Sequence, residues 1–373
     1  MKILYVIPSL QKGGAERLAI DICKEVNARQ EHEAMLLVLS DKNEYTYQTK
    51  DLPIRKTSSS VSLSLLKKSK IDLSDFEKIV HKFKPDIIHS HLFTAEVFSR
   101  EKIHPGIKYF THCHDNMPQL RNISARTFFK KKLLTDFYEK QHLLKNYLDC
   151  NNKFIAISEH TKEYFESVLP AQLAKNIFLL NNAIDFKQFN SVNQKRNFDK
   201  IRIVNVGSFV GKKNQQLFIS IAEELQRRKL NAEIVLLGNG PLYTEIKKQI
   251  EQKNLQQIIS MHANVMRVED YYAQANMYVH TATYEPFGLV LLEAMATGLP
   301  VISLDGGGNR GLVNDENGFM LHEQSARLFA DKAELLFNDK ILHDKLSEGA
   351  VAFAKRFDIV SYTDKLLKLY EEN

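Results

Sequence analysis

The chain of 373 residues contains no tryptophan and only three cysteines, Cys23, Cys113 and Cys150. An odd number of cysteines without a CxxC spacing argues against a disulfide framework and against the usual zinc clusters, and it favours a reducing, intracellular setting. The 15 glycines and 9 prolines are too few for a collagen or a low-complexity chain. Because no run of about 18 apolar residues is present, we expect no transmembrane helix. The first apolar run, Ile3–Ile7, is too short for the core of a signal peptide.

The composition is that of a globular protein, with 44% hydrophobic and 26% charged residues. The length favours two domains. The net charge of +6 is unevenly distributed, because residues 1–185 hold 28 Lys and Arg against 22 Asp and Glu, whereas the rest of the chain holds 23 of each sign. Such an asymmetry indicates an anionic partner for the first half.

Short apolar runs alternate with segments of helical periodicity along most of the chain. Continuous apolar strands separated by helices are typical of parallel sheets that are covered on both faces. The pattern pauses in a polar, asparagine-rich stretch over 181–200 and then resumes. The expected strands are Ile3–Ile7, Ala34–Leu39, Asp86–His89, Lys108–Thr111, Phe154–Ile157 and Ile177–Leu180, followed by Ile201–Val206, Ala232–Leu237, Ile258–Met261, Met277–His280 and Pro300–Leu304.

Two such series predict an α/β protein with two doubly wound, Rossmann-like domains that face each other across a cleft. We expect an N-terminal domain over 1–185, a linker over 186–200, a C-terminal domain over 201–355 and a last helix within 356–373 that can cross back to the first domain. In such sheets ligands bind beyond the carboxyl ends of the strands, so the cleft is the expected site.

Histidines follow two of the expected strands, as His89-Ser90-His91 and as His112-Cys113-His114. We expect paired histidines that leave a strand to diverge, and the sequence places no third ligand. These histidines are therefore interpreted as the polar wall of a site and not as a metal centre.

The most informative stretch is the Glu-Pro-Phe-Gly sequence that begins at Glu285. Its glycine precedes an expected helix over Leu289–Thr297. Glu293 lies about one turn inside that helix, near enough to face the same ligand as Glu285. A carboxylate accepts hydrogen bonds from paired sugar hydroxyls, and backbone N–H groups at a helix start bind phosphate.

This frame, Glu-Pro-Phe-Gly…Leu-Glu-Ala-Met-Ala-Thr-Gly-Leu-Pro-Val, resembles the signature of the family 4 retaining glycosyltransferases, which have the two-Rossmann-domain GT-B fold. Other motifs of that family occur in the same order over nearly the whole chain. They are Gly13-Gly14-Ala15-Glu16, His114-Asp115, Ser158-Glu159, Asn182-Ala183-Ile184-Asp185, Val206-Gly207 with Lys213-Asn214, and Leu237-Gly238-Asn239-Gly240-Pro241.

The resemblance implies a role for each matching residue. Three would act at the reacting centre: His114 lines it, Glu285 binds hydroxyls of the transferred sugar, and Lys213 neutralises the diphosphate. Glu293 would hold the ribose, and the Gly14 amide would cap the diphosphate from the other domain. The remaining donor-binding positions are Ser208, Asn264, Phe287, Gly288 and Leu289.

One departure from the family pattern concerns the phosphate loop. Members usually carry Arg directly after its glycine, where this chain has Ser208. One cation on the leaving diphosphate is therefore missing, so Lys213 or its neighbour Lys212 must contribute more.

The resemblance implies a retaining glycosyltransferase that moves a sugar from a UDP- or GDP-sugar to a glycan or lipid-linked acceptor, in the synthesis of a surface polysaccharide or glycolipid. We expect no cofactor and no metal, since no DxD-type site is present. Two alternatives stay open: another GT-B sugar-nucleotide enzyme such as an epimerase, and a catalytically silent homologue that acts as a partner or scaffold.

The basic excess is densest around Lys130-Lys131-Lys132, where cations alternate with apolar residues. A helix with an apolar stripe and flanking lysines can lie on an anionic membrane, and the same pattern describes a core-facing helix with solvated lysines. We expect a cytoplasmic protein, in peripheral contact with the inner face of the membrane if the first reading holds. Nucleic acid is not an expected partner, because no RNA- or DNA-binding motif is found.

Overall fold

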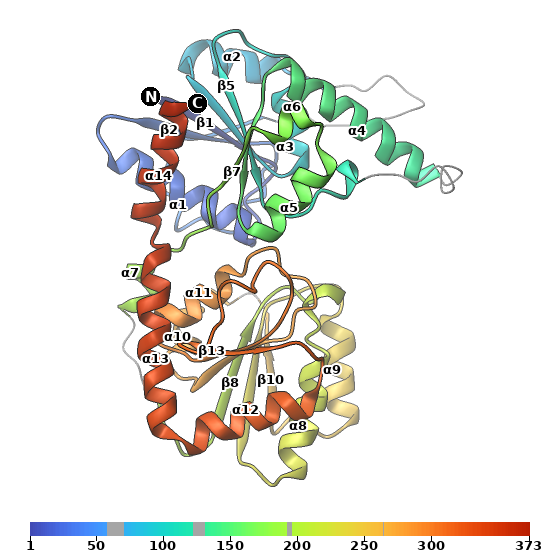
Figure 1. Ribbon diagram of the computed structural model, residues 1–373, viewed down its shortest axis with the longest axis vertical. Coiled ribbons are helices and arrows are strands. Elements are labelled where there is room, and N and C mark those ends of the chain that lie inside the picture. The colour runs from blue at the N-terminus through green and yellow to red at the C-terminus, as the bar shows by residue number, and fades with distance from the viewer. Residues whose placement is uncertain (58–70, 122–130, 192–195, 264) are drawn as a thin grey trace. The chain divides into compact units, whose positions relative to one another are not determined.

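The computed structural model describes residues 1–57, 71–121, 131–191, 196–263 and 265–373, and these divide into two compact units (Figure 1). Unit 1 consists of Met1–Ala183 together with Ile359–Asn373, and unit 2 consists of Ile184–Asp358. The last helix therefore belongs to the unit in which the chain begins. The first boundary falls within the Asn182–Asp185 motif.

Unit 1 contains a parallel sheet with the strand order β3-β2-β1-β4-β5-β6-β7. Its strands are β1 (Lys2–Ile7), β2 (Glu33–Val38), β3 (Ile54–Lys56), β4 (Ile87–His91), β5 (Lys108–Cys113), β6 (Lys153–Ala156) and β7 (Ile177–Leu179). Its helices are α1 (Gly14–Ala28), α2 (Ser74–Phe83), α3 (Phe93–Ser99), α4 (Lys131–Asp149), α5 (Glu159–Val168), α6 (Ala171–Ala174) and α14 (Ile359–Glu372), with a 3₁₀ turn at Pro118–Leu120.

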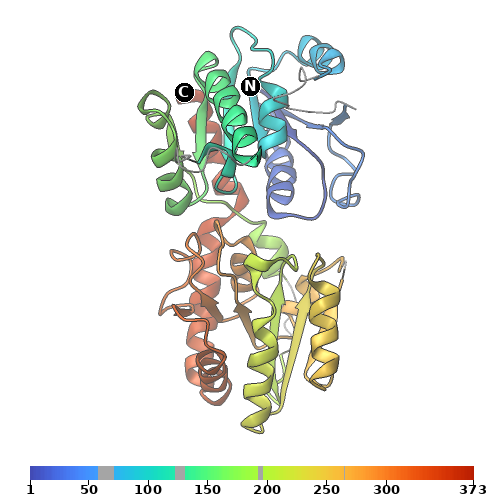
Figure 2. The ribbon, with the colours of Figure 1, turned by 90° about the vertical axis from the view of Figure 1, so that its right-hand side faces the viewer.

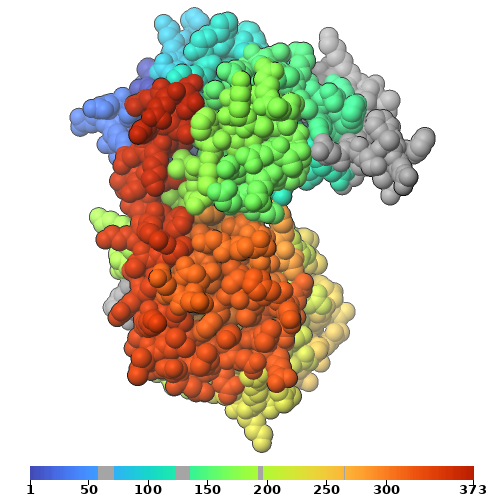
Figure 3. All heavy atoms as spheres, in the orientation of Figure 1, coloured from blue at the N-terminus to red at the C-terminus, as the bar shows by residue number. Residues whose placement is uncertain are grey.

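The two faces of this sheet are buried by different helices. Because successive side chains of a strand point to opposite faces, Ile3, Tyr5 and Ile7 of β1 pack with α1 and α14, whereas Leu4 and Val6 pack with α2 and α3. In the space-filling view the red residues of α14 lie against the blue and green residues of unit 1 (Figure 3).

Unit 2 contains a second parallel sheet, with the strand order β10-β9-β8-β11-β12-β13. Its strands are β8 (Ile201–Val206), β9 (Ala232–Leu237), β10 (Ile259–His262), β11 (Met277–His280), β12 (Val301–Leu304) and β13 (Gly318–Leu321). Its helices are α7 (Phe186–Asn190), α8 (Leu217–Arg227), α9 (Tyr243–Gln252), α10 (Glu269–Tyr272), α11 (Leu289–Ala296), α12 (Ala326–Asn338) and α13 (Lys340–Ala354), with 3₁₀ turns at Gly211–Lys213 and Lys355–Phe357 (Figure 2).

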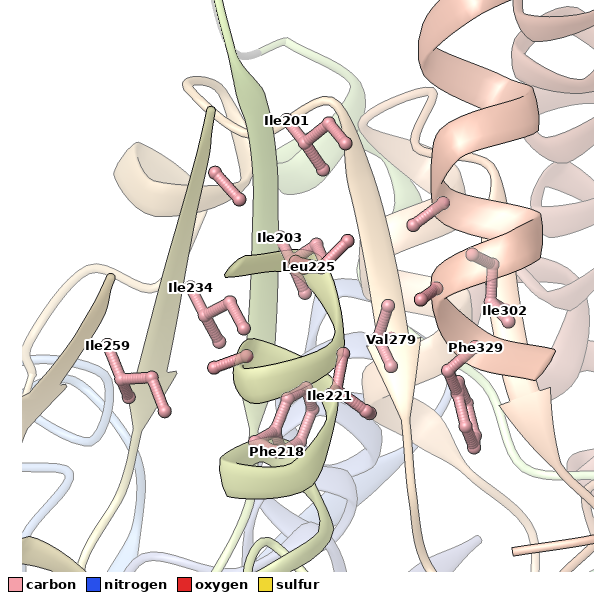
Figure 4. Close-up of a cluster of buried hydrophobic side chains, with 14 of the residues drawn as sticks. Ile201, Ile203, Phe218, Ile221, Leu225, Ile234, Ile259, Val279, Ile302 and Phe329 are labelled. Carbon is pink, nitrogen blue, oxygen red and sulfur yellow. The ribbon is translucent and has the colours of Figure 1, made fainter. Parts of the chain in front are cut away.

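The largest apolar cluster of unit 2 lies on one face of this sheet (Figure 4). Ile203, Ile234, Val279 and Ile302 come from four neighbouring strands, and α8, α9 and α12 cover them with residues such as Phe218. The alternate positions of the same strands, including Tyr278 and His280, therefore point to the opposite face, where α11 contacts β11 and β12.

Strands that the sequence predicts lie within two residues of those observed, but the edge strands β3 and β13 were missed, whereas the opposite edge strands β7 and β10 were predicted. β3 has only three residues, Ile-Arg-Lys, which are half-buried or exposed. β13 begins at Gly318, where a Cβ atom would lie 2.0 Å from the carbonyl oxygen of Val301, so this strand approaches its neighbour too closely for any other residue. β3 therefore lacks the apolar run that marks a strand, and the apolar run of β13 is only the three residues Phe319–Leu321.

Part of the predicted linker over 186–200 is helical instead. Residues 186–190 form α7, which the Asp185 side chain caps by accepting a hydrogen bond from the Gln188 amide at 2.9 Å. Because the segment is polar, its sequence showed no sign of this short helix, in which Phe189 is buried.

None of the helices in the described part of the chain combines the length and the apolar character that a membrane crossing requires. Lys130 lies outside the described residues, and the side chains of Lys131 and Lys132 are outside them too.

A substitution in α14 tests whether this helix completes the core of unit 1. Leu366 is fully buried there, so we expect Leu366→Ala to lower the free energy of unfolding of unit 1 by about 2–5 kcal/mol. Lys368→Ala, on the exposed side of the same helix, should change it by less than about 0.5 kcal/mol. Hydrogen exchange of the β1 amides at increasing urea concentration measures both, and equal protection in the two variants would contradict the packing of α14.

Candidate functional site

The polar residues of unit 2 gather where the direction of strand progression reverses. The chain runs outward from β8 to β9 and β10, then returns to the other side of β8 with β11 and continues to β12 and β13. β8 and β11 are neighbours, and the loops that follow them lead in opposite directions along the sheet. Open α/β sheets bind ligands at such a point. The first of these loops carries Lys213 and the second carries Glu285.

Glu285 is a buried carboxylate held by two cationic or polar partners. Its Oε2 atom lies 2.5 Å from the Lys213 ammonium and 2.9 Å from Nε2 of His280, and the residue is only 6% exposed. Burial by itself would raise the pKa of this carboxyl, but the Lys213 charge and the His280 hydrogen bond more than compensate and lower it from 4.5 to about 2. Glu285 is therefore an ionised group that only accepts hydrogen bonds.

The backbone of Glu285 is fixed by a glycine-rich loop that follows β12. The Glu285 amide donates to the Gly306 carbonyl and its own carbonyl accepts from the Gly308 amide, both at 2.8 Å. A Cβ atom at Gly308 would lie 1.9 Å from the Pro286 carbonyl oxygen, so this close approach requires glycine. The buried side chain of Asn309 closes the loop by accepting from the Gly306 amide at 2.8 Å.

His280 connects this carboxylate to the sheet. Its Nδ1 atom lies 3.4 Å from the hydroxyl of Tyr278, which donates to the Val206 carbonyl on the neighbouring strand at 3.2 Å. Burial lowers the pKa of His280, although Glu285 opposes that effect. His280 and Tyr278 were missed in the sequence, where the only signal was a histidine and a tyrosine at alternate positions of an otherwise apolar strand.

Helix α11 begins directly beside Glu285. Gly288 adopts a left-handed conformation, with φ +112°, and starts the helix. The Phe287 side chain is buried, with its ring 6.1 Å from that of Phe357, so only its backbone can face a ligand. The α11 N-terminus therefore offers the amides around Phe287–Leu289 for an anion.

Glu293 lies one turn further along α11 and is half-buried. Its Oε2 atom accepts a hydrogen bond from Tyr272 of α10 at 3.3 Å. Sequence reasoning missed Tyr272, because nothing near Glu293 in the sequence points to it. The structure thus brings Lys213, Glu285 and His280 into direct contact and places Glu293 on the helix that follows.

The two lysines after β8 have different partners. Lys212 lies 4.9 Å from the centre of the Tyr284 ring, whereas Lys213 reaches Glu285. Ser208 is exposed, and its carbonyl accepts from the Gln215 side chain at 3.0 Å. The structure therefore puts Lys213, and not Lys212, beside the carboxylate.

A cavity of about 580 Å³ lies at the carboxyl end of β10, still within unit 2. The rings of His262 and Tyr271, 5.5 Å apart, form part of its wall. Asn264 lies outside the described residues. The lining residues are Met261, His262, Ala263, Val265, Met266, Arg267, Asp270 and Tyr271.

In unit 1 the glycine loop after β1 holds Gly14 as the first residue of α1. The Tyr45 hydroxyl accepts from the Gly13 amide at 3.1 Å and donates to its carbonyl at 3.0 Å. A Cβ atom at Gly13 would lie 2.2 Å from the Glu16 carboxylate, so a larger residue here would displace only that flexible side chain.

The expectation that the paired histidines diverge was wrong. β4 extends to His91 and β5 to Cys113, so His89 and His91 point to one face of the sheet, as residues i and i+2 of a strand do. His112 joins them from β5. His114, just after β5, bonds through Nε2 to Nδ1 of His91 at 2.8 Å, and burial lowers its pKa well below 6.5.

Comparisons with known proteins identify relatives of both units. Residues 12–188 match the family described as Glycosyltransferase Family 4, and residues 186–353 match Glycosyl transferases group 1. The chain is 24% identical, over 76% of its length, to the phosphatidylinositol N-acetylglucosaminyltransferase GPI3 subunit of Saccharomyces cerevisiae. It is 22% identical, over 53% of its length, to the amylovoran biosynthesis glycosyltransferase AmsD of Erwinia amylovora. The matched parts span 60% and 56% of these relatives.

Solved structures share the fold of the whole chain. HepE of Anabaena, crystallised with UDP and glucose, superimposes with a TM-score of 0.78 at 19% identity, over 100% of both chains. A glycosyltransferase of Rickettsia africae superimposes with a TM-score of 0.76 at 18% identity, over 100% of this chain and 98% of the other. At such low identity these likenesses show the fold alone.

The pH dependence of stability tests the state of Glu285. A carboxyl whose pKa is lowered on folding stabilises the protein fully above about pH 4.5, and this stabilisation is lost as the pH falls toward 2. The shift corresponds to about 3 kcal/mol. We expect Glu285→Gln to lower the free energy of unfolding by an amount of that order near neutral pH, and the difference from wild type to shrink below pH 4.5.

Urea unfolding followed by circular dichroism over a pH series measures this difference. Glu251→Gln, at an exposed position of the same unit, provides the control and should match wild type throughout. A Glu285→Gln difference that stayed constant down to pH 3 would mean that Glu285 is not held ionised.

Proposed function

Because the chain belongs to the family 4 type of glycosyltransferases with the GT-B fold, we propose that it transfers a sugar from a nucleotide-sugar to a glycan or lipid-linked acceptor, with retention at the anomeric carbon. The observation that carries the proposal is the contact between Lys213 and the ionised Glu285 at the switch point of unit 2, with Glu293 on the adjoining helix.

Each of these groups has a task that suits its chemistry. Glu285, an acceptor without a proton, binds hydroxyls of the transferred sugar, and Glu293 binds hydroxyls of the ribose. An ammonium has three N–H donors, so Lys213 can hold Glu285 with one and a phosphate oxygen with another. The roles that the resemblance gives to Gly14 and His114 stay predictions.

Sugar transfer requires stabilisation of the negative charge that develops on the departing diphosphate. In this proposal Lys213 and the amides at the α11 N-terminus supply it without a metal ion at the phosphates. Removal of one such preorganised donor typically raises a barrier by ~2.7–4 kcal/mol. Since Ser208 replaces the usual arginine, Lys213 carries a larger share of this stabilisation.

The relatives guide the choice of donor and acceptor. HepE was crystallised with UDP and with UDP-glucose, which supports a UDP-sugar as donor. The relatives' names include a phosphatidylinositol N-acetylglucosaminyltransferase subunit and an amylovoran biosynthesis enzyme, which supports a lipid-linked or polysaccharide acceptor. We further propose that the protein works at the inner face of the membrane.

Removal of the ribose hydroxyls tests the assignment of Glu293. Hydrogen bonds to a charged group contribute about 1.5–3 kcal/mol, so wild type should bind UDP about 10- to 100-fold more tightly than 2′,3′-dideoxy-UDP. Glu293→Ala should bind both nucleotides equally weakly. Glu285→Gln is the matched control, because its side chain is assigned to the sugar and it should keep the preference for UDP.

Isothermal titration calorimetry measures these affinities, after a thermal-shift screen of UDP, GDP and ADP has identified the preferred base. Discrimination that survives in Glu293→Ala would contradict the ribose assignment. A chain that binds a nucleotide-sugar but neither transfers the sugar nor hydrolyses the donor would favour the catalytically silent homologue.

A flotation experiment tests the membrane contact. Each lysine near an anionic surface contributes about 1 kcal/mol, so replacement of Lys130, Lys131 and Lys132 by Gln should weaken binding to vesicles of phosphatidylglycerol and phosphatidylcholine by about 100-fold. The same replacement at Lys67, Lys68 and Lys70 is the charge-matched control and should have a smaller effect. The full chain is used, because α14 forms part of unit 1. If both triple variants bind the vesicles equally well, the lysines at 130–132 are ordinary solvated surface residues and not a membrane contact.

A further inference from the structure

Three histidines of unit 1 form a group on the sheet face that α1 and α14 cover. His89 and His91 come from β4, and His112 lies opposite His91 on β5 in the strand register. All three are essentially inaccessible to solvent. Their ring centres lie 4.7, 4.9 and 5.2 Å apart, with ring planes within 29° of one another. We call these residues the histidine group.

Each member uses one ring nitrogen in a hydrogen bond with a neighbouring side chain. Nδ1 of His89 lies 2.5 Å from the Tyr370 hydroxyl of α14, and Nδ1 of His91 lies 2.8 Å from Nε2 of His114. Nε2 of His112 lies 3.2 Å from the side-chain oxygen of Asn182.

The second nitrogen of each ring is buried and has no hydrogen-bond partner among the described residues. These atoms are Nε2 of His89, Nε2 of His91 and Nδ1 of His112. A buried polar atom without a partner destabilises the folded state. Three of them within one group therefore need an explanation.

The hydrogen bonds indicate which nitrogens carry the lone pairs. The Asn182 oxygen can only accept, so Nε2 of His112 carries the proton and Nδ1 is the lone-pair atom. Tyr370 donates its hydroxyl hydrogen to Tyr5, so its oxygen can accept from Nδ1–H of His89. Nδ1–H of His91 can likewise donate to Nε2 of His114, and the lone pair of His91 then lies on Nε2.

We propose that the histidine group binds one divalent transition-metal ion of the zinc class through these three nitrogens. One ring nitrogen from each of the three residues already lies within 4.8 Å of the ring nitrogens that the other two offer. Zinc with Zn–N distances of about 2.1 Å would draw them to about 3.4 Å apart. The rings are nearly parallel without an ion, so each must turn about its Cβ–Cγ bond, a torsion that is broad and soft for histidine.

The chemistry of the group favours this class of ion over others. Neutral imidazole suits Zn²⁺, Cu²⁺ and Ni²⁺, whereas Ca²⁺ and Mg²⁺ prefer oxygen ligands, which the group does not offer. Burial lowers the pKa of His89 and of His91 well below 6.5 and that of His112 to about 4, so the rings are in the neutral form that binds metals. Metal-binding histidines typically donate their other N–H to an oxygen or a polar partner, as His89 and His112 can.

The location indicates a structural and orienting ion. The group has no exposed face, so a substrate cannot reach it. Through Tyr370 the ion would tie the sheet to α14, and through His91 it would fix the ring of His114. The ion therefore takes no part in the departure of the diphosphate, and this inference stands independently of the proposed function.

The test measures metal retention by the untagged full chain. After treatment with a chelator and dialysis against Zn²⁺, mass spectrometry of the metal content should find one equivalent of zinc in wild type. Calorimetric titration with Zn²⁺ should give an affinity that His89→Gln weakens by more than about 100-fold and that Tyr370→Phe, which removes only the orienting hydroxyl, weakens by roughly 10-fold.

His343→Gln is the matched control. This histidine is equally buried, but both of its nitrogens have partners in unit 2, so the variant should keep the affinity of wild type. X-ray absorption of the bound zinc should report three imidazole nitrogens.

Three outcomes would overturn the proposal. The first is wild type that retains no zinc, in which case the three nitrogens do not form a metal site. The second is unchanged affinity in both His89→Gln and Tyr370→Phe, and the third is an equal loss in His343→Gln. The zinc content of wild type does not depend on any variant, so it can still contradict the proposal if His89→Gln fails to fold.

Discussion

Burial of both faces of each sheet governs where this protein can carry polar chemistry. Helices cover the strands on either side, so a polar side chain inside a strand has no access to water and persists only with a partner. Arg100, which is 1% exposed, bonds through its guanidinium to Ser90, Thr111 and Asn152. Its network lies on one face of unit 1, and the histidine group lies on the other. The ends of the strands and the loops beyond them escape this constraint.

The candidate site of unit 2 follows from the same constraint. Glu285 lies just beyond β11, where the chain leaves the sheet, yet it is buried and keeps its charge because Lys213 and His280 both contact one oxygen. A buried charge is costly unless it is paired and hydrogen-bonded. The glycines of the 306–308 loop let its backbone come close enough to hold Glu285 against that pair. The position of Glu285 thus depends both on its charged and polar partners and on the close packing of the 306–308 backbone.

Much of this could be read from the sequence because the signals were local. Apolar runs gave the central strands to within two residues, and the Glu-Pro-Phe-Gly frame located Glu285, Gly288 and Glu293. The edge strands β3 and β13 were missed, since β3 is short and polar and β13 starts at a glycine that serves a contact with Val301. The divergence of the histidines was misjudged because β4 was ended two residues too early, which hid that His89 and His91 share a face.

The sequence alone determined the fold class, the two-domain organisation and the set of polar residues at the strand ends, because strand periodicity and motif spacing are properties of neighbours along the chain. The tertiary structure decided which of these residues meet. Lys213 and Glu285 are 72 positions apart, His89 and Tyr370 are 281 apart, and their contacts depend on strand order and on the return of α14 to unit 1. Strand order and helix docking minimise exposed apolar surface over the whole chain, and no local pattern records their outcome.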